Sequence, residues 1–270
     1  MIETIQNISP FQQAFAAGVF AWALSAFGAG LILATKGFNQ KFFDAMLGFA
    51  GGVMIAATFW SLLQPAIEMS GASGPAAWFP AAAGFLLGTI FLRMLDKLLP
   101  HVHHGFSREE AEGLKTTWPR STLLVLAITL HNIPEGLALG VAIGAAASGF
   151  PEASAAAALA LTIGIGVHNI PEGFAVSAAV RREGFSRMKS LWYGQLSAAV
   201  YPAAALIGLA AVVWTRALLP YALGFAGGAM IFVAVEEVIP ESQRGGNTDL
   251  ATAGTIIGFI GMMILDVAIG

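Results

Sequence analysis

The 270-residue chain contains no cysteine and very little charge. Without cysteine there is no disulfide framework, no thiolate metal site and no cysteine nucleophile. Charged residues make up only 11% of the chain, whereas soluble domains average about a quarter. The net charge of −3 gives no indication of a nucleic-acid partner. A chain so poor in charge is not expected to fold as a water-soluble globule.

Apolar residues dominate instead. Hydrophobic residues account for 57% of the chain, in continuous runs that do not alternate as the strands of a membrane β-barrel do. A helix needs about 20 mostly apolar residues to cross the hydrocarbon layer, and eight runs are long enough: residues 11–34, 42–64, 78–99, 121–148, 153–180, 190–214, 218–240 and 250–269. We therefore predict an all-α membrane protein with eight transmembrane helices, embedded in a lipid bilayer as a single polytopic domain over residues 1–270.

Basic residues divide unequally between the two sides of the predicted bundle. Twelve of the thirteen lysines and arginines lie in or beside the first, third, fifth and seventh connections. Arg216 alone lies on the other side. Because basic residues are concentrated on the cytoplasmic side of a membrane, we expect the odd connections in the cytoplasm and both termini outside it. The predicted location is the cell membrane.

A segment at the start of the second predicted helix recurs in the seventh. Residues 47–55 read LGFAGGVMI and residues 223–231 read LGFAGGAMI, so eight of nine positions agree. Small residues can recur simply because they let membrane helices pack closely. However, the predicted orientation makes these two helices run in opposite directions. This favours an inverted repeat of helices one to three and six to eight around central helices four and five, which is typical of alternating-access transporters.

The strongest chemical signal is a duplicated motif. HNIPEG occurs at residues 131–136 in the fourth predicted helix and again at residues 168–173 in the fifth. Each copy has a histidine and a glutamate four residues apart, which places both on the same face of a helix. An ionisable side chain at the bilayer centre costs about 2.5–3.5 kcal/mol on insertion scales. Four such groups need partners, which can be each other, water or a cation.

Two imidazoles and two carboxylates form a donor set of nitrogen and oxygen. This set suits Zn²⁺ at roughly 2.0–2.2 Å, and also Fe²⁺, Co²⁺, Mn²⁺ or Cd²⁺, whereas Ca²⁺ and Mg²⁺ prefer oxygen alone. Pro134 and Pro171 cannot donate to the carbonyl four residues earlier, which leaves a free carbonyl beside each histidine. We predict a site for a divalent metal ion with four ligands: His131, Glu135, His168 and Glu172.

With these motifs the chain resembles the ZIP family of metal-ion transporters, and in particular its bacterial zinc-transporting branch. The resemblance covers the whole chain and implies transport of Zn²⁺ into the cytoplasm, with iron, cadmium and manganese as further candidate ions. It implies that the four motif residues ligate a first ion, that Asn132 and Asn169 lean toward a second, and that Met54 adds a soft ligand. The family's sixth helix often has a glutamate where this chain has Tyr201, so we expect one bound ion rather than two. The resemblance also makes a homodimer a candidate assembly.

Further polar residues are candidates for the path of the ion. Three glutamates toward the cytoplasmic end of the seventh predicted helix would receive a released cation: Glu236, Glu237 and Glu241. Two residues nearer the outer side would help capture an arriving ion: Ser61 and Asp266. Carboxylates near helix ends can also simply reach the lipid headgroups. Three histidines of the connection at about 100–120 are candidate weak zinc ligands or part of a solvated linker: His101, His103 and His104.

Two alternative functions use the same residues. Intramembrane metalloproteases place histidine and glutamate on membrane helices, but in an HExxH motif, and here Asn132 and Asn169 follow the histidines. A bis-histidine haem protein would use His131 and His168 but would not need the paired glutamates and prolines. The chain has no GxxxxGK[ST] nucleotide-binding loop. We therefore expect a secondary transporter, not an enzyme, with no cofactor beyond the transported ion.

Overall fold

The computed structural model describes residues 8–34, 39–70, 76–100, 113–149, 153–213 and 216–269. His101, His103 and His104 lie outside these residues, so their zinc binding stays a prediction. The described secondary structure is helical, and eight segments are long and apolar enough to cross a membrane: Pro10–Leu33, Gln40–Glu68, Phe79–Leu98, Val125–Ala147, Ala155–Arg182, Arg187–Val212, Leu219–Arg244 and Thr248–Ile269. The predicted all-α fold with eight membrane helices is confirmed.

Four of the eight spans contain more than one helical element. The first consists of α2 (Pro10–Gly30) and the short η1 (Leu31–Leu33), and the second of α3 (Gln40–Ala57), η2 (Thr58–Leu63) and α4 (Gln64–Glu68). The third to fifth are α5 (Phe79–Leu98), α6 (Arg120–Ala147) and α7 (Ala155–Arg182). The sixth consists of α8 (Arg187–Ser197) and α9 (Tyr201–Val213). After η4 (Arg216–Leu218), the seventh consists of α10 (Leu219–Val233), η5 (Ala234–Val238) and α11 (Ile239–Arg244), and α12 (Thr248–Ile269) is the eighth.

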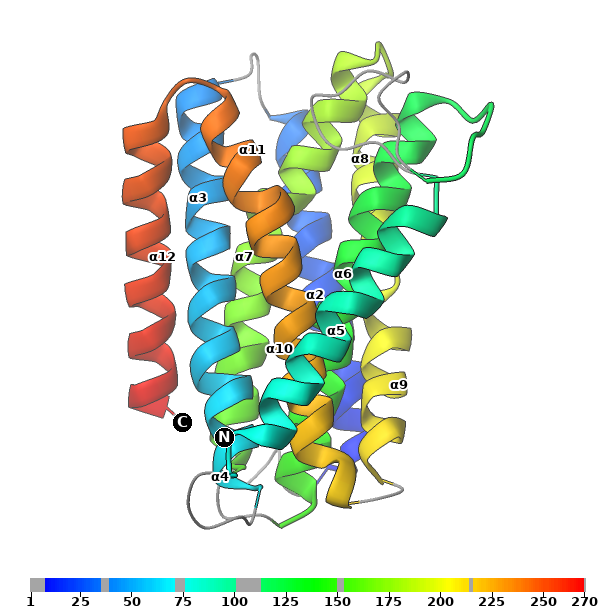
Figure 1. Cartoon of the computed structure of the whole chain (residues 1–270). Coiled ribbons are helices and arrows are strands. Elements are labelled where there is room, and N and C mark those ends of the chain that lie inside the picture. Colours follow the sequence, from blue (N-terminus) through cyan, green and yellow to red (C-terminus); the bar gives the residue numbers. More distant parts are fainter. Residues whose placement is uncertain are drawn as a thin grey trace.

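Two of these irregularities are π-helices in equivalent places. In the second span η2 precedes Pro65, and in the seventh η5 precedes Pro240. A proline cannot donate to the carbonyl four residues earlier and its ring clashes with that carbonyl, so the preceding turn widens. Figure 1 shows α3 leading down to α4, whereas α10 leads up to α11. The two spans therefore share the same local distortion while running in opposite directions.

The sixth span differs from the continuous helix that we predicted over residues 190–214. Residues 198–200 form a turn between α8 and α9, in which the Tyr201 N–H donates to the Ala198 carbonyl three residues back. Pro202, at the second position of α9, is unable to donate to that carbonyl, which favours the break. The turn brings the Ser197 carbonyl and the Tyr201 side chain to face the central helices α6 and α7.

Glycines set how closely the outer helices approach. A Cβ atom on Gly48 or Gly52 of α3 would lie 2.1 or 2.0 Å from a carbonyl oxygen of α12, those of Ala251 and Thr255. Gly224 and Gly228 of α10 lie in the same way against carbonyls of α5. Such backbone approach is possible only without a side chain. The second and seventh helices thus use the same two glycines of their shared segment for equivalent contacts.

These contacts predict the effect of adding one methyl group. Gly52→Ala and Gly228→Ala should each push two backbones apart and lower the free energy of unfolding by about 1–3 kcal/mol, the usual cost of overpacking. Gly261→Ala on α12 is the matched control, because nothing lies within 4 Å of its added Cβ. Thermal unfolding of the purified protein in detergent measures the difference. An unchanged midpoint for all three variants would contradict the described packing.

Candidate metal centre

Three ionisable side chains meet in the middle of the bundle. Glu135 of α6 and His168 and Glu172 of α7 offer ligand atoms that all lie within 4.8 Å of one another. Glu135 and His168 are 1% and 0% exposed, so both have left water almost completely. One imidazole and two carboxylates form a donor set that suits Zn²⁺ and similar divalent ions. These residues are close enough to hold one ion together.

His168 is oriented for coordination through one particular nitrogen. Its Nδ1 lies 3.2 Å from the Gly164 carbonyl, which accepts a hydrogen bond, so Nδ1 carries a proton. The other nitrogen, Nε2, lies 2.9 Å from Glu135 Oε2 and 4.0 Å from Glu172 Oε1. Histidines that bind metals usually donate their second N–H to a carbonyl or carboxylate in this way. The lone pair of a neutral His168 therefore faces both glutamates.

Glu135 has one oxygen that is left without a donor. Its Oε2 accepts a hydrogen bond from the Tyr201 hydroxyl and lies 2.9 Å from His168 Nε2, whereas Oε1 is buried and finds no hydrogen-bond partner among the described residues. A buried acceptor without a partner costs roughly 1–3 kcal/mol, and more when it is charged. A bound cation would remove this cost, so the residues present fit a divalent metal ion.

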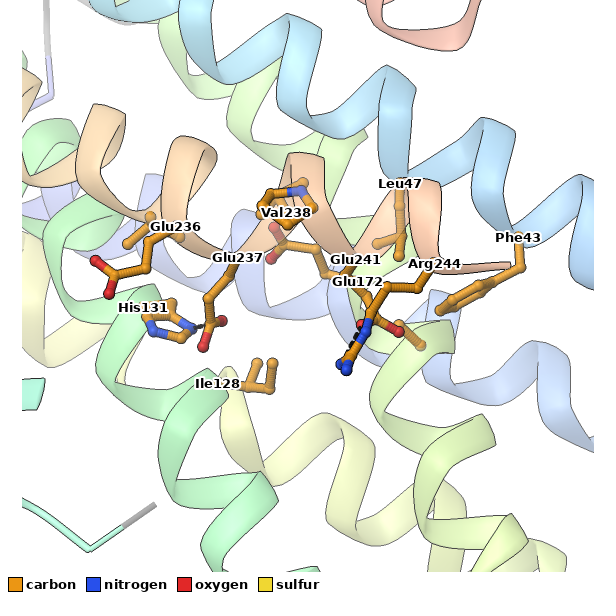
Figure 2. Close-up of a pocket in the computed structure, with 13 residues that line it drawn as sticks. Phe43, Leu47, Ile128, His131, Glu172, Glu236, Glu237, Val238, Glu241 and Arg244 are labelled. Carbon is orange, nitrogen blue, oxygen red and sulfur yellow. Dashed lines mark ion pairs between the residues drawn. The ribbon is translucent and has the colours of Figure 1, made fainter. Parts of the chain in front are cut away.

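His131 is placed differently from its counterpart in the second motif. Its Nδ1 lies 2.7 Å from Glu237 Oε2 of η5, and His131 is not part of the three-residue cluster. In Figure 2 a dashed line marks this contact between His131 and Glu237, which both line a cavity. The two HNIPEG copies are identical in sequence but meet different neighbours. His131 therefore lies outside the cluster and lines the cavity instead.

Asn132 and Asn169 both face Tyr201. Asn132 Nδ2 donates to the Ser197 carbonyl and Asn169 Nδ2 donates to the Ala21 carbonyl. Their Oδ1 atoms lie 3.4 and 2.8 Å from the Tyr201 hydroxyl. The Tyr201 side chain is completely buried. The sequence predicted Tyr201 only as the replacement of a glutamate, and its contacts with both asparagines were not predicted. A tyrosine in a long apolar run could have indicated them, because its buried hydroxyl needs a hydrogen-bond partner.

A cavity of about 310 Å³ leads from the centre to one end of the bundle. His131 and Glu172 line its inner part, and Phe43 and Arg244 line it near the ends of α3 and α11. Three further glutamates line it: Glu236, Glu237 and Glu241. Glu236 is also paired with Arg93 at 2.8 Å, and Glu241 lies 3.5 Å from Arg244. The four glutamates outnumber the lining arginine, so the cavity favours cations.

The remaining predicted residues, Ser61, Asp266 and Met54, are not part of this cluster. Ser61 of η2 donates a 2.6 Å hydrogen bond to Asp266 of α12, so the structure brings these two residues together. Asp266 Oδ2 is buried without a hydrogen-bond partner among the described residues. Met54 is completely buried in the core of the bundle, and its role as a ligand stays a prediction.

Comparison with known proteins decides the family. The ZIP zinc transporter family model matches residues 107–266. This chain belongs to the ZIP zinc transporter family. It is 37% identical to the human zinc transporter ZIP11, over 98% of this chain and all of that protein. It is 40% identical to the zinc transporter GufA of Myxococcus xanthus, over 94% of this chain and 98% of GufA, and 37% identical to ZIPB of Bordetella bronchiseptica, over 94% and 80%.

Membership in the ZIP family makes the chain a multi-pass membrane transporter of divalent metal, with the metal and the lipid bilayer as its partners. Members of this family are not enzymes, so the metalloprotease alternative is wrong. The family match is independent of the side-chain geometry described above. The family match and the geometry both point to the cluster of Glu135, His168 and Glu172 as the candidate place where the metal binds.

The unequal positions of the two histidines predict unequal effects on binding. His168→Ala should weaken Zn²⁺ binding by more than about 100-fold, because it removes a ligand of the cluster. His131→Ala should weaken binding by only about tenfold, the lower end of the range for residues that support a metal site without ligating the ion. Competition of the purified protein against a zinc chelator measures both affinities. Equal losses would show that the two histidines act as equivalent ligands, contrary to this geometry.

Proposed function

We propose that this ZIP-family chain carries divalent metal ions, with Zn²⁺ as the principal ion, across the cell membrane into the cytoplasm by alternating access. The ion binds among Glu135, His168 and Glu172. The observation that carries this proposal is the position of His168 Nε2, which faces a carboxylate oxygen of Glu135 at 2.9 Å and one of Glu172 at 4.0 Å, with His168 and Glu135 almost completely buried. A buried donor set with nothing else to neutralise it is a binding site for a cation.

The direction of transport is supported by the position of the cavity. The cavity reaches the end of the bundle that carries Arg181, Arg182, Arg187, Lys189 and Arg244. The concentration of basic residues supports a cytoplasmic position for this end, with both termini on the outer side. In the opposite direction the bundle is packed with fully buried side chains such as Leu139, Leu161 and Ile165. The arrangement corresponds to an inward-open state.

The path of the ion then has three stages. Ser61 and Asp266, on the outer side, attract and partly dehydrate the arriving cation. The cluster of Glu135, His168 and Glu172 binds it in the middle. His131 and Glu237 take the ion as it leaves the cluster, and Glu241 lies next along the wall of the cavity toward the cytoplasm. Each stage offers oxygen or nitrogen ligands that compete with the previous stage.

The repeated architecture supports the alternation. The glycine contacts between α3 and α12 recur between α10 and α5, and each pair is made of one helix from either half of the chain. Two such pairs can move as rigid bodies against α6 and α7, which carry the centre. We propose this inverted repeat as the moving part of a single transport domain.

Uptake into proteoliposomes tests the function. Wild-type protein should admit Zn²⁺, and a comparison with Cd²⁺, Fe²⁺, Mn²⁺ and Co²⁺ measures its selectivity. Glu135→Ala should lower Zn²⁺ uptake to the level of empty liposomes, because it removes a cluster ligand and leaves His168 without its nearest carboxylate. A zinc-sensitive dye inside the vesicles records the rate.

Glu68→Ala provides the matched control for this experiment. Glu68 is an exposed glutamate at the end of α4, and its carboxylate accepts a hydrogen bond from the Gln64 side chain. It is far from the cluster in sequence, so this variant should transport like the wild type. Wild-type rates in the Glu135→Ala vesicles would overturn the assignment of the site. Accumulation of zinc from the medium by intact cells that express the protein, but not by cells with Glu135→Ala, tests the inward direction.

A further inference from the structure

We propose that the Tyr201 hydroxyl occupies the place of a second cation beside the metal centre and so restricts the centre to one ion. The proposal rests on the proposed transport site and specifies its stoichiometry. It concerns the atoms that surround this hydroxyl, which come from both copies of the HNIPEG motif.

Three oxygen atoms converge on the Tyr201 hydroxyl. They are Oδ1 of Asn132, Oε2 of Glu135 and Oδ1 of Asn169. The two amides are oriented by their own hydrogen bonds, because each Nδ2 already donates to a backbone carbonyl, of Ser197 or Ala21. Their oxygens are therefore the atoms that face the hydroxyl. This orientation does not depend on a choice between amide nitrogen and oxygen.

The surroundings of the hydroxyl hold more acceptors than it has protons. A tyrosine hydroxyl has one hydrogen and can donate to one acceptor at a time. Here it meets three acceptors, one of them a carboxylate, in a place where all three side chains are at most 2% exposed. Several oxygens that converge without enough donors form the surroundings that a divalent cation prefers. Among the described residues, the Tyr201 hydroxyl is the one group that lies within hydrogen-bond distance of all three oxygens.

The ring of Tyr201 also blocks the place sterically. A cation bound to the same three oxygens would have to sit where the hydroxyl oxygen lies, next to the ring carbon that carries it. Gly18 and Gly136 allow the backbone of Tyr201 to approach: an added Cβ on either would lie 2.9 or 3.2 Å from the Tyr201 carbonyl oxygen. Neighbouring helices therefore hold the backbone of Tyr201 close, and its completely buried side chain has little room to swing away.

The position of the hydroxyl has a second consequence for Glu135. The hydroxyl donates to Oε2, which also lies 2.9 Å from His168 Nε2, while Oε1 has no partner among the described residues. Tyr201 is thus a positioning residue that directs the carboxylate toward a single ion instead of letting it bridge two. It acts through Glu135 and is not itself proposed as a ligand.

Counting bound ions tests the proposal. The full-length protein in lipid nanodiscs is equilibrated with buffered Zn²⁺, the zinc content is measured, and X-ray absorption at the zinc edge is used to look for a second zinc at about 3.5–4 Å, the usual separation in two-metal sites. The wild type should show no zinc–zinc scattering. Tyr201→Phe should also show none, because a cation at the place of the hydroxyl would still clash with the ring carbon that remains. Tyr201→Glu, which replaces the ring by a shorter carboxylate, should bind one additional zinc and show the zinc–zinc distance.

Tyr193→Phe is the control for loss of a tyrosine hydroxyl, because Tyr193 packs on Phe185 and not on the centre. Zinc–zinc scattering in the wild type would overturn the proposal while leaving the proposed transport site intact. A folded Tyr201→Glu protein without the additional zinc would also overturn it. If Tyr201→Glu does not fold, the wild type and Tyr201→Ser, which opens the same place, decide the question in the same way. A wild type with no zinc bound to a histidine nitrogen would overturn both this proposal and the proposed function.

Discussion

The structure depends on one constraint, which is the burial of ionisable groups inside an apolar bundle without full compensation by the protein. Glu135 and His168 lie at the centre of the bundle with almost no exposure. One oxygen of Glu135 contacts His168 Nε2 and accepts from the Tyr201 hydroxyl, whereas the other has no donor in the part of the chain that the structure describes. A network in which every acceptor had a donor would be more stable, but it would offer a cation no unpaired oxygen. The unpaired oxygen of Glu135 therefore favours the binding of a positive charge.

Close packing of the outer helices surrounds this centre. Glycines let α3 approach α12 and α10 approach α5 with backbone contacts, so each pair behaves as one thick element. Three irregular segments precede prolines: η2 precedes Pro65, η5 precedes Pro240, and the turn before α9 precedes Pro202. Each of these segments delivers a polar residue to the ion path. The prolines therefore determine where the polar side chains of otherwise apolar helices point.

Much of this could be predicted from the sequence, and the limits have physical reasons. The eight spans follow from the length of apolar runs, a property of the sequence alone. The pairing of Glu172 with His168 follows from their spacing within one helix. The separate position of His131 could not be predicted, because two identical motifs differ only in their neighbours, Glu237 of η5 in one case and Glu135 in the other. Tyr201 was predicted only as a missing carboxylate, since its contacts depend on the turn before α9.

Anomalous diffraction from crystals of the protein grown with Cd²⁺ or Zn²⁺ tests the central claim most directly. The account predicts one strong peak within bonding distance of His168 Nε2, between Glu135 and Glu172. The absence of a peak among these three side chains, with the ion bound elsewhere in the bundle, would contradict it.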